Sequence, residues 1–433
     1  MHRTALIGAA LALTVFMPGN STVRAHHSTP DVVFEWNQIL QDTLPIPHNV
    51  LTPRFFALTH IAMFDAINTL DRDFEPYHVR LRHGAGGSPE AAAAQAAHDV
   101  IVALNPSAAA TYDAALANRI GTSPSGFVQR GTEVGARVAA EILAWRQNDG
   151  WVVSPFPPYS EPPLPGRWQK TPPANANAAF THLQNAAPLA LLTSTQYLPP
   201  PPPSLTSERY AADLNEVKLI GKSDSATRTP EQTVIARLWN GTAASGTGTA
   251  TNYASIWNSI ARDAAQARGL SLIETARLFV LLNVSVHDAL HTTQVSKFVY
   301  GLWRPVTAIR QADTDLNAAT DPDPAWLPLL GTPPYPSYAG NMATIGASAA
   351  RALQLAFGTN DMPVTATWHQ SGGQPDVSHQ FPGFWEAAEE QTESRIYGGI
   401  HYRFDHVAGH QVGRSAAEFV AANYMAPRHR WDD

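Results

Sequence analysis

An apolar segment with helical character occurs twice in this chain, and the repeat restricts the folds that the chain can adopt. Residues 53–68 and 271–291 are apolar on most sides, which is typical of helices buried in a protein core. Aligned with an offset of 223 positions, the segments match at Arg54 and Arg277, Phe56 and Phe279, Leu58 and Leu281, Asp65 and Asp288, and Ala66 and Ala289. We interpret this match as an internal duplication of a helical bundle. The alternative is convergent composition, because Ala and Leu are common in all helices.

The rest of the chain also favours helices. Starts marked by Pro or Ser and apolar periodicity predict further helices, at residues 32–40, 89–104, 132–146, 207–220, 230–239, 254–268 and 342–357. Evidence for strands is thin, because no pair of alternating runs flanks a tight turn. The sequence therefore predicts an all-α fold of two related helical bundles, with residues 26–150 in the first half and 207–433 in the second.

Between these halves lies a segment, residues 151–206, that is too rich in Pro for helices. Its composition is typical of a linker. It also contains the large rings of Trp151, Phe156, Tyr159 and Trp168, and a free linker rarely carries so many. We therefore favour an ordered, irregular excursion that packs on the helices.

The first 25 residues have the pattern of a secretory signal peptide. Arg3 supplies a positive charge, residues 5–16 form an apolar stretch, and residues 23–25 match a small-x-small cleavage site. The apolar stretch is short for a membrane span, although a single membrane anchor is the alternative. No other segment has about 20 continuous apolar residues. We therefore expect a soluble mature protein, secreted or periplasmic, that does not act at a membrane.

Charge and cysteine content exclude several kinds of function. The net charge of -7 provides no basic excess to neutralise nucleic-acid phosphates. The chain has no Cys, which excludes disulfides, a thiol nucleophile, a Cys-ligated zinc site and an iron–sulfur cluster. We therefore expect small-molecule partners and no nucleic acid, and the sequence leaves open whether the chain forms a homo-oligomer.

Two basic residues after the second apolar segment form the first candidate binding motif. Lys297 and Arg304 are seven residues apart, so on one helix they would share a face, about 10 Å apart. Pro305 disfavours helical backbone at Arg304, so we expect the helix to end there and Arg304 to extend sideways. A Lys charge and an Arg fork suit phosphate-like oxygens, although two basic residues alone are more typical of a solvated helix face.

Arg395 and His401 form the second candidate motif. They are six residues apart, which places them on different faces of an unbroken helix, but Gly398 and Gly399 lie between them. Glycine adopts positive φ easily, so the chain can turn here and bring the guanidinium and the imidazole together. The alternative is an ordinary loop with a surface histidine. Combined, the two motifs supply three cations and one imidazole, the groups that a tetrahedral oxyanion site requires.

Together the motifs resemble the family of vanadium-dependent haloperoxidases and type 2 phosphatidic-acid phosphatases, which includes bacterial acid phosphatases. The family pattern is Lys-x6-Arg-Pro, then Pro-Ser-Gly-His, then Ser-Arg-x3-Gly-x-His. The first and third blocks match at Lys297, Arg304, Pro305, Ser394, Arg395, Gly399 and His401. Trp303 and residues 307–310 also resemble the bacterial haloperoxidase-related branch. The resemblance covers about residues 30–425 and implies an all-α fold of two bundles.

The middle block departs from the family pattern. Residues 332–343 align with it so that Gly340 takes the serine position, Asn341 the glycine position and Met342 the histidine position. The helix that we predict to start here can still direct the backbone N–H groups of Gly340 and Asn341 at an oxyanion. The substitutions remove one hydroxyl and one acid/base imidazole, because Met342 cannot transfer protons.

The resemblance implies a vanadate cofactor held by Lys297, Arg304, Ser394 and Arg395, with His401 as its axial ligand, in a site that phosphate can also occupy. We therefore expect a haloperoxidase-like oxidoreductase that uses peroxide to oxidise halide. One alternative is an acid phosphatase that hydrolyses phosphate esters with His401 as nucleophile. It is disfavoured because Met342 cannot supply general acid catalysis, worth roughly 10²–10⁴-fold. The other is a catalytically degenerate member that binds phosphate without turnover.

Six histidines near these blocks are candidates to replace the missing acid/base group. They are His287, His291, His369, His379, His406 and His410, and the sequence does not rank them. The first two, with Asp288, resemble a metal-binding pair. Because they lie on an apolar helix, we interpret them instead as a buried carboxylate beside packing imidazoles.

Overall fold

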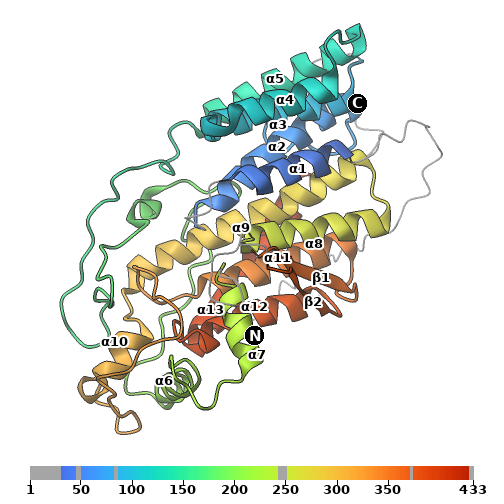
Figure 1. Ribbon diagram of the computed structural model, residues 1–433. Coiled ribbons are helices and arrows are strands. Elements are labelled where there is room, and N and C mark those ends of the chain that lie inside the picture. Colours follow the sequence, from blue (N-terminus) through green and yellow to red (C-terminus); the bar gives the residue numbers. More distant parts are fainter. Residues whose placement is uncertain (1–30, 45–49, 82–85, 242–250, 371–373, 429–433) are drawn as a thin grey trace, which may run out of the picture.

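The computed structural model describes residues 31–44, 50–81, 86–241, 251–370 and 374–428. These residues form a predominantly helical protein, which confirms the predicted fold class. The N-terminal helices lie at one end of Figure 1 and the C-terminal helices at the other, with the long helix α9 between them. The predicted signal peptide lies outside the described residues.

The N-terminal bundle consists of five helices. They are α1 (Asp31–Thr43), α2 (Thr52–Asp71), α3 (Pro89–Leu104), α4 (Ala109–Ile120) and α5 (Gly126–Arg146). Helix α3 is central, because it packs on α1, α2, α4 and α5. It approaches α5 so closely that a Cβ atom on Gly135 would lie 2.3 Å from the Ala92 carbonyl oxygen. The sequence did not indicate α4, in which only Tyr112 and Leu116 are buried.

The C-terminal bundle surrounds α11 and is built from helices that follow the Pro-rich segment. They are α8 (Tyr253–Arg268), α9 (Leu272–Tyr300), α11 (Asn341–Phe357), α12 (Phe384–Tyr397) and α13 (Arg403–Asn423). Helix α11 packs on α9, α12 and α13, while α9 also packs on α2 of the first bundle. A capping box of Ser271 and Glu274 starts α9, and Gly301 in left-handed conformation ends it. One apolar core therefore runs through both bundles.

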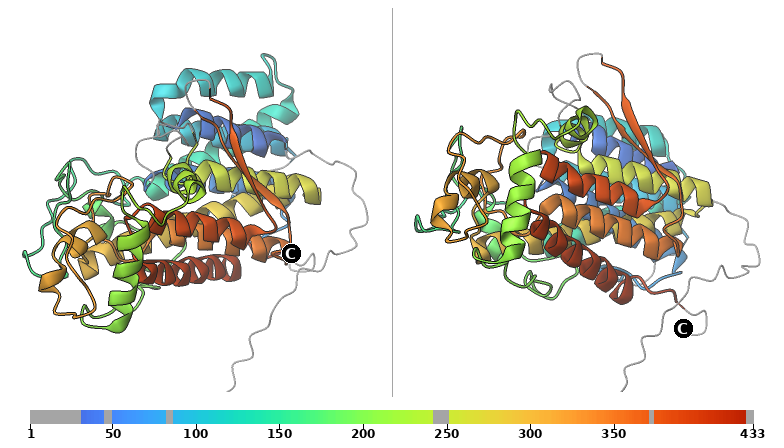
Figure 2. Two further views of the ribbon diagram at one scale, coloured as in Figure 1. Left: turned by 60° about the horizontal axis from the view of Figure 1, so that its bottom comes forward. Right: turned by 90° about the horizontal axis from the view of Figure 1, so that it is seen from below.

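Shorter elements lie around the C-terminal bundle, except for one 3-10 turn between α3 and α4 of the N-terminal bundle. They are α6 (Glu208–Ile220), α7 (Pro230–Leu238), α10 (Pro305–Arg310), the 3-10 turns η1 (Pro106–Ala108), η2 (Thr181–Asn185) and η3 (Ala312–Thr314), and the strands β1 (Val364–Trp368) and β2 (Val377–Phe381). Figure 2 shows α6, α10 and the irregular segments gathered at one end of the molecule. The strands pair antiparallel, with Val364 opposite Phe381. We did not predict this hairpin from the sequence, because the two short strands are separated by eight residues, 369–376, and not by a two-residue turn motif.

The Pro-rich segment is irregular and packed, as predicted. Trp151 and Trp168 are each only 2% exposed. The Trp151 ring lies 4.2 Å from the His287 ring, and the Tyr159 ring meets Phe298 edge-on at 4.9 Å, both distances between ring centroids. The segment is therefore part of the folded body, and the domain boundaries that we assign at residues 150 and 206 remain a prediction.

Two buried carboxylates occupy matching places in the sequence repeat and make the same kind of contact. Asp65 accepts the backbone N–H groups of residues 77–79 at 2.7–2.9 Å. Asp288 accepts those of residues 189–191 at 2.7–2.8 Å. Both side chains are fully buried. The matched positions thus share a structural role, which supports the duplication.

Among the described residues, no single helix has the length and apolar character needed to cross a membrane. The segments Pro89–Leu104 and Pro106–Ile120 meet those criteria only as a pair, which is bent by 118°.

Candidate functional site

A cavity of about 110 Å³ lies where the predicted motifs meet in the C-terminal bundle. Its walls include Arg395, His401, Asn341 and Met342, with the Tyr335 ring beside them. The volume is well above the roughly 10–15 Å³ that one water occupies on a comparable measure. The structure therefore brings residues of the middle and third sequence blocks together around a space that can hold a small anion, while Lys297 and Arg304 of the first block do not line it.

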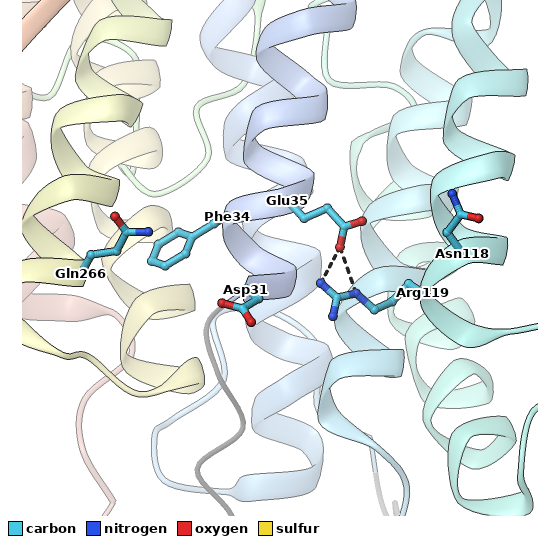
Figure 3. Close-up of a pocket in the computed structure, with 6 residues that line it drawn as sticks. All are labelled: Asp31, Phe34, Glu35, Asn118, Arg119 and Gln266. Carbon is cyan, nitrogen blue, oxygen red and sulfur yellow. Dashed lines mark hydrogen bonds and ion pairs between the residues drawn. The ribbon is translucent and has the colours of Figure 1, made fainter.

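A larger hollow of about 610 Å³ lies elsewhere on the protein, between α1, α4 and α8. Figure 3 shows Glu35 of α1 bound to the guanidinium of Arg119 of α4, with Gln266 on the far side. The Glu35–Arg119 contact is 2.9 Å at the guanidinium Nε. No residue that the sequence singled out lines this hollow, so we do not assign the chemistry to it.

The turn after α12 brings Arg395 and His401 together, as the sequence predicts. Helix α12 ends at Tyr397, and Gly399 follows with φ of +75°. A Cβ atom on Gly399 would lie 2.3 Å from the Gly221 carbonyl oxygen, so both the backbone conformation and the space require glycine. The Ile400 N–H then donates to the Arg395 carbonyl at 3.2 Å, which closes the turn. As a result both motif residues line the cavity.

His401 is held in one tautomer by its two neighbours. Its Nδ1 lies 2.7 Å from Asp405 Oδ2, and its Nε2 lies 3.1 Å from Arg304 Nη1. Arginine nitrogens only donate, so Nε2 must be the acceptor and the proton must sit on Nδ1, facing Asp405. Ser337 Oγ donates to the same Asp405 oxygen at 2.6 Å. The Nε2 lone pair is thus kept free of a proton.

Arg304 extends from a non-helical backbone, as Pro305 predicts. Its φ and ψ are -82° and 156°, although α9 already ends four residues earlier, at Tyr300, because Gly301 terminates it. The Arg304 Nε donates to the Tyr335 carbonyl at 2.7 Å, and Nη1 donates to the Ile400 carbonyl at 2.9 Å. Its Nη2 is buried and has no hydrogen-bond partner within the described residues.

Arg395 is positioned by its neighbours in the chain and by α7. Its Nη1 donates to Asn240 Oδ1 at 3.0 Å, and its Nη2 donates to the Ala236 carbonyl at 3.2 Å. Its Nε donates to Ser394 Oγ at 3.0 Å, while the Ser394 hydroxyl donates to the Gln391 carbonyl. Ser394 therefore orients Arg395 and does not line the cavity, which differs from the direct oxyanion contact that we expected.

Lys297 lies behind the cavity wall. Its Nζ donates to the carbonyls of Ser337, at 2.7 Å, and Ala339, and lies 5.4 Å from the centroid of the Tyr335 ring. The ammonium has three N–H donors, so these contacts leave one for another acceptor. Lys297 is fully buried and does not line the cavity, so its link to the other cations is electrostatic.

The site is a buried cluster of positive charge. Burial lowers the pKa of Lys297 and of Arg304, and the Arg304 charge lowers the Lys297 pKa further. Burial also lowers the pKa of Arg395, to about 10. The pKa of His401 is lowered well below its ordinary value by burial and then by the charges of Arg304 and Lys297. Every group is pushed toward its uncharged form, and an anion in the cavity would relieve this.

The middle block corrects the prediction for Gly340, while the predicted role of the Asn341 backbone N–H stays a prediction. The Gly340 N–H donates to the Asp405 carbonyl at 3.0 Å, so our expectation that it faces the oxyanion is wrong. Asn341 is the first residue of α11 and lines the cavity, and its buried Oδ1 has no partner among the described residues. Met342 also lines the cavity, at the position that the resemblance assigns to an acid/base histidine. The wall is therefore apolar at that point.

Among the candidate replacement histidines, His406 lies next to the site. Its ring centroid is 6.3 Å from that of His401, and neither of its nitrogens has a partner among the described residues. His406 does not line the cavity, and burial and the nearby His410 lower its pKa well below the ordinary value. The others are occupied elsewhere: His287 with Asp288, His291 with the Leu183 carbonyl, His369 with Asp376, His379 with Glu390 and His410 with Thr392.

The sequence reasoning missed three residues of this site. Asp405 follows His401 by four positions at the start of α13, and a carboxylate at that spacing was a usable signal. Asn240 and Tyr335 come from loops, and their sequence context carries no comparable signal. They are recognisable only once the chain has brought them to Arg395 and Arg304.

Comparisons with known proteins agree with this arrangement. The family model of the VCPO second helical-bundle domain matches residues 277–429, a segment that supplies most residues of the cavity wall. The vanadium chloroperoxidase of Curvularia inaequalis is 25% identical over 180 residues. That match covers 32% of this chain and 29% of the relative, so the chain aligns with under a third of that protein's length. Residues 277–429 are thus similar to a helical-bundle domain of vanadium haloperoxidases.

Solved structures of vanadium haloperoxidases share its fold. The crystal structure of the first bacterial vanadium-dependent iodoperoxidase superposes with a TM-score of 0.76 at 23% identity, covering 93% of this chain and 98% of that one. The apo-type structure of a bacterial vanadium-dependent chloroperoxidase gives a TM-score of 0.68 at 16% identity, covering 87% and 95%. These likenesses establish the fold, and the chemistry has to be argued from the side chains.

The cavity fits a vanadate ion by two observations. Arg304 Nη2 is a buried hydrogen-bond donor without a partner in the described chain. The His401 Nε2 lone pair is kept free of a proton by Asp405 and Arg304. The donor set therefore suits an anion with one imidazole ligand.

Proposed function

We propose that this protein is a vanadium-dependent haloperoxidase-like enzyme, with vanadate held by Lys297, Arg304 and Arg395 and ligated by His401. The observation that carries the proposal is the orientation of His401. Its Nδ1 proton is fixed on Asp405, so Nε2 stays unprotonated beside two guanidinium groups and an anion-sized cavity. An imidazole nitrogen kept in this state is the form that ligates a metal centre.

The other residues of the site bind, orient and exclude water. The free N–H groups of Arg304 Nη2 suit an oxyanion oxygen, and Arg395, held by Asn240 and Ser394, presents a second guanidinium. Asp405 keeps the Nδ1 proton in place and, as a single buried carboxylate, offsets part of the positive charge. When bound, vanadate would supply the Lewis acid that activates peroxide toward a halide.

Met342 makes iodide the first halide to test. An imidazole at this position could deliver a proton to peroxide, whereas a thioether cannot, so we expect a weaker oxidant. Iodide is the most easily oxidised of the common halides. The most similar fold described above is that of a protein named an iodoperoxidase, which supports the same choice.

The test is oxidation of iodide and bromide by hydrogen peroxide, before and after incubation of the purified protein with orthovanadate. We expect vanadate-dependent turnover that is faster with iodide than with bromide. His401→Ala should abolish vanadate binding, measured by equilibrium dialysis. His406→Ala is the matched control, because it removes a buried imidazole 6.3 Å away that does not line the cavity. Unchanged vanadate binding in His401→Ala would contradict the proposal.

Two other outcomes would identify the alternatives. If the protein binds vanadate and does not oxidise halide, but slowly hydrolyses phosphate esters, the result would indicate an acid phosphatase with His401 as nucleophile. Thermal stabilisation by phosphate without any turnover would indicate a family member that only binds the anion. We also propose a secreted or periplasmic location, as the sequence predicts. A secretion assay of the full chain tests this location directly.

A further inference from the structure

The Met342 thioether is a reactive group in the cavity that the proposed reaction does not use. Met342 is the second residue of α11 and lines the same cavity as His401 and Arg395. It is only 8% exposed, and because it lines this cavity we expect peroxide to reach its sulfur from there. A cavity of about 110 Å³ admits molecules the size of hydrogen peroxide.

A neighbouring amide fixes the orientation of the sulfur. Gln391 Nε2 lies 3.5 Å from Met342 Sδ, and Gln391 Oε1 lies 2.7 Å from the indole Nε1 of Trp257. Indole N–H only donates, so Oε1 must face Trp257 and the Nε2 amino group must face the sulfur. One sulfur lone pair thus accepts a weak hydrogen bond, and the second lone pair stays available for reaction.

We propose that Met342 is an oxidation site of this protein, converted to methionine sulfoxide by hydrogen peroxide that enters the oxyanion cavity. The free sulfur lone pair attacks one peroxide oxygen, so the S–O bond forms while the O–O bond breaks. The departing hydroxide takes the proton of the transferred OH group and leaves as water. Sulfur loses two electrons and peroxide gains them. The biological setting rests on the proposed function, in which peroxide is the co-substrate.

The modification would change what the cavity binds. A thioether is apolar, whereas a sulfoxide carries a strongly accepting oxygen. Placed in the wall beside His401 and Arg395, this oxygen competes for N–H donors and repels an anion in the same space. Oxidation by the co-substrate would therefore lower oxyanion affinity, and methionine sulfoxide reductases could restore it.

The chain supplies an internal control for exposure. Met362 is also 8% exposed, but it lines neither of the two cavities described above. The intact protein would be treated with hydrogen peroxide, and the sulfoxide at each methionine would be quantified by peptide mass spectrometry over time. We expect Met342 to be oxidised about tenfold faster than Met362, because susceptibility follows access. Equal rates at the two residues would overturn the proposal.

A second arm uses inorganic phosphate to fill the cavity. Phosphate should slow oxidation at Met342 by at least about fivefold and leave Met362 unchanged, because only Met342 shares the anion space. Phosphate that binds, as seen by thermal stabilisation, without protecting Met342 would also refute the proposal. If phosphate does not bind, the oxyanion site fails, while the comparison of Met342 with Met362 still decides the oxidation site.

The effect on binding is tested in a variant that cannot be oxidised at this position. After peroxide treatment, the phosphate affinity of the wild-type protein should fall by roughly tenfold, the effect of one unfavourable buried polar contact. The same treatment should leave the affinity of Met342→Leu unchanged, and Met362→Leu should behave as wild type. An equal loss in Met342→Leu would show that oxidation at another residue is responsible.

Discussion

Replacing Asp405 by Asn should change the stability of the fold little but disturb the tautomer of His401, the proposed vanadate ligand. Burial raises the Asp405 pKa to about 6 from 3.8. Because the folded-state pKa is raised, the carboxyl contributes stability below pH 3.8 and loses it as the pH rises through 6. At pH 8 its ionisation therefore costs about 3 kcal/mol, which Asn removes.

The same substitution disturbs His401. Asp405 Oδ2 accepts from His401 Nδ1 at 2.7 Å and from Ser337 Oγ at 2.6 Å. If the Asn oxygen accepts from Ser337, its amino group faces Nδ1, and the His401 proton moves to Nε2. That N–H would then oppose the Arg304 donor, now 3.1 Å away. This contact offsets part of the gain, so we expect the unfolding free energy to stay within about 2 kcal/mol of wild type.

Vanadate binding should respond much more strongly. Loss of the partner that orients a ligating histidine typically lowers metal affinity by about 10–100-fold, and we expect this loss in Asp405→Asn. Affinity would be measured by equilibrium dialysis, and stability by urea denaturation at pH 8. Asp65→Asn is the matched control, because Asp65 is also fully buried with a pKa of about 6 but lies in the other bundle. Wild-type affinity in Asp405→Asn would refute this account of the tautomer.

Three other substitutions test residues described above or packed beside them. His60 is fully buried, and burial lowers its pKa to about 3. Neutral His60 therefore favours folding above pH 6.5, and this contribution is lost as the pH falls toward 3. Between pH 7 and pH 5, His60→Gln should lose about 2 kcal/mol less stability than the wild-type protein, as measured by urea denaturation. Gly399→Ala should lower stability by at least about 2 kcal/mol more than Gly358→Ala, since both glycines have positive φ but only at Gly399 would an added Cβ meet other atoms within 4 Å. Equal melting temperatures would contradict this. Met342→His should raise vanadate-dependent iodide oxidation by up to about 10²-fold, and no gain would mean that proton delivery does not limit the reaction.

Local backbone rules predicted much of the fold and the two outer site motifs. Pro305 fixes the extended backbone at Arg304, and Gly399 makes the turn that joins Arg395 to His401. Both effects act within a few residues of the motif, so the sequence contains them. Caps and Pro starts likewise marked most helices to within a few residues, although α9 extends beyond the predicted segment because its polar C-terminal part is also buried.

The features that the sequence did not reveal depend on contacts between distant segments. The Gly340 N–H meets a carbonyl 65 positions later, at Asp405, and this contact withdraws it from the oxyanion. Lys297 donates to backbone carbonyls of a loop about 40 residues away, so its charge acts from behind the cavity wall. No local pattern determines either partner. The hairpin of β1 and β2 was missed for a different reason, because eight residues separate two short strands and no two-residue turn motif joins them directly.

The paired carboxylates Asp65 and Asp288 have a consequence for protein engineering. Asp288 lies on α9, the helix that also carries Lys297, and its three backbone partners belong to the Pro-rich segment. Deleting that segment as a dispensable insertion would leave the buried Asp288 carboxylate with His287 but without its three backbone donors, inside the helix that carries Lys297. In the first bundle, the partners of Asp65 follow its own helix directly, so that connection is short. Shortened or circularly permuted versions of this protein should therefore keep residues 189–191 and can be cut more safely elsewhere.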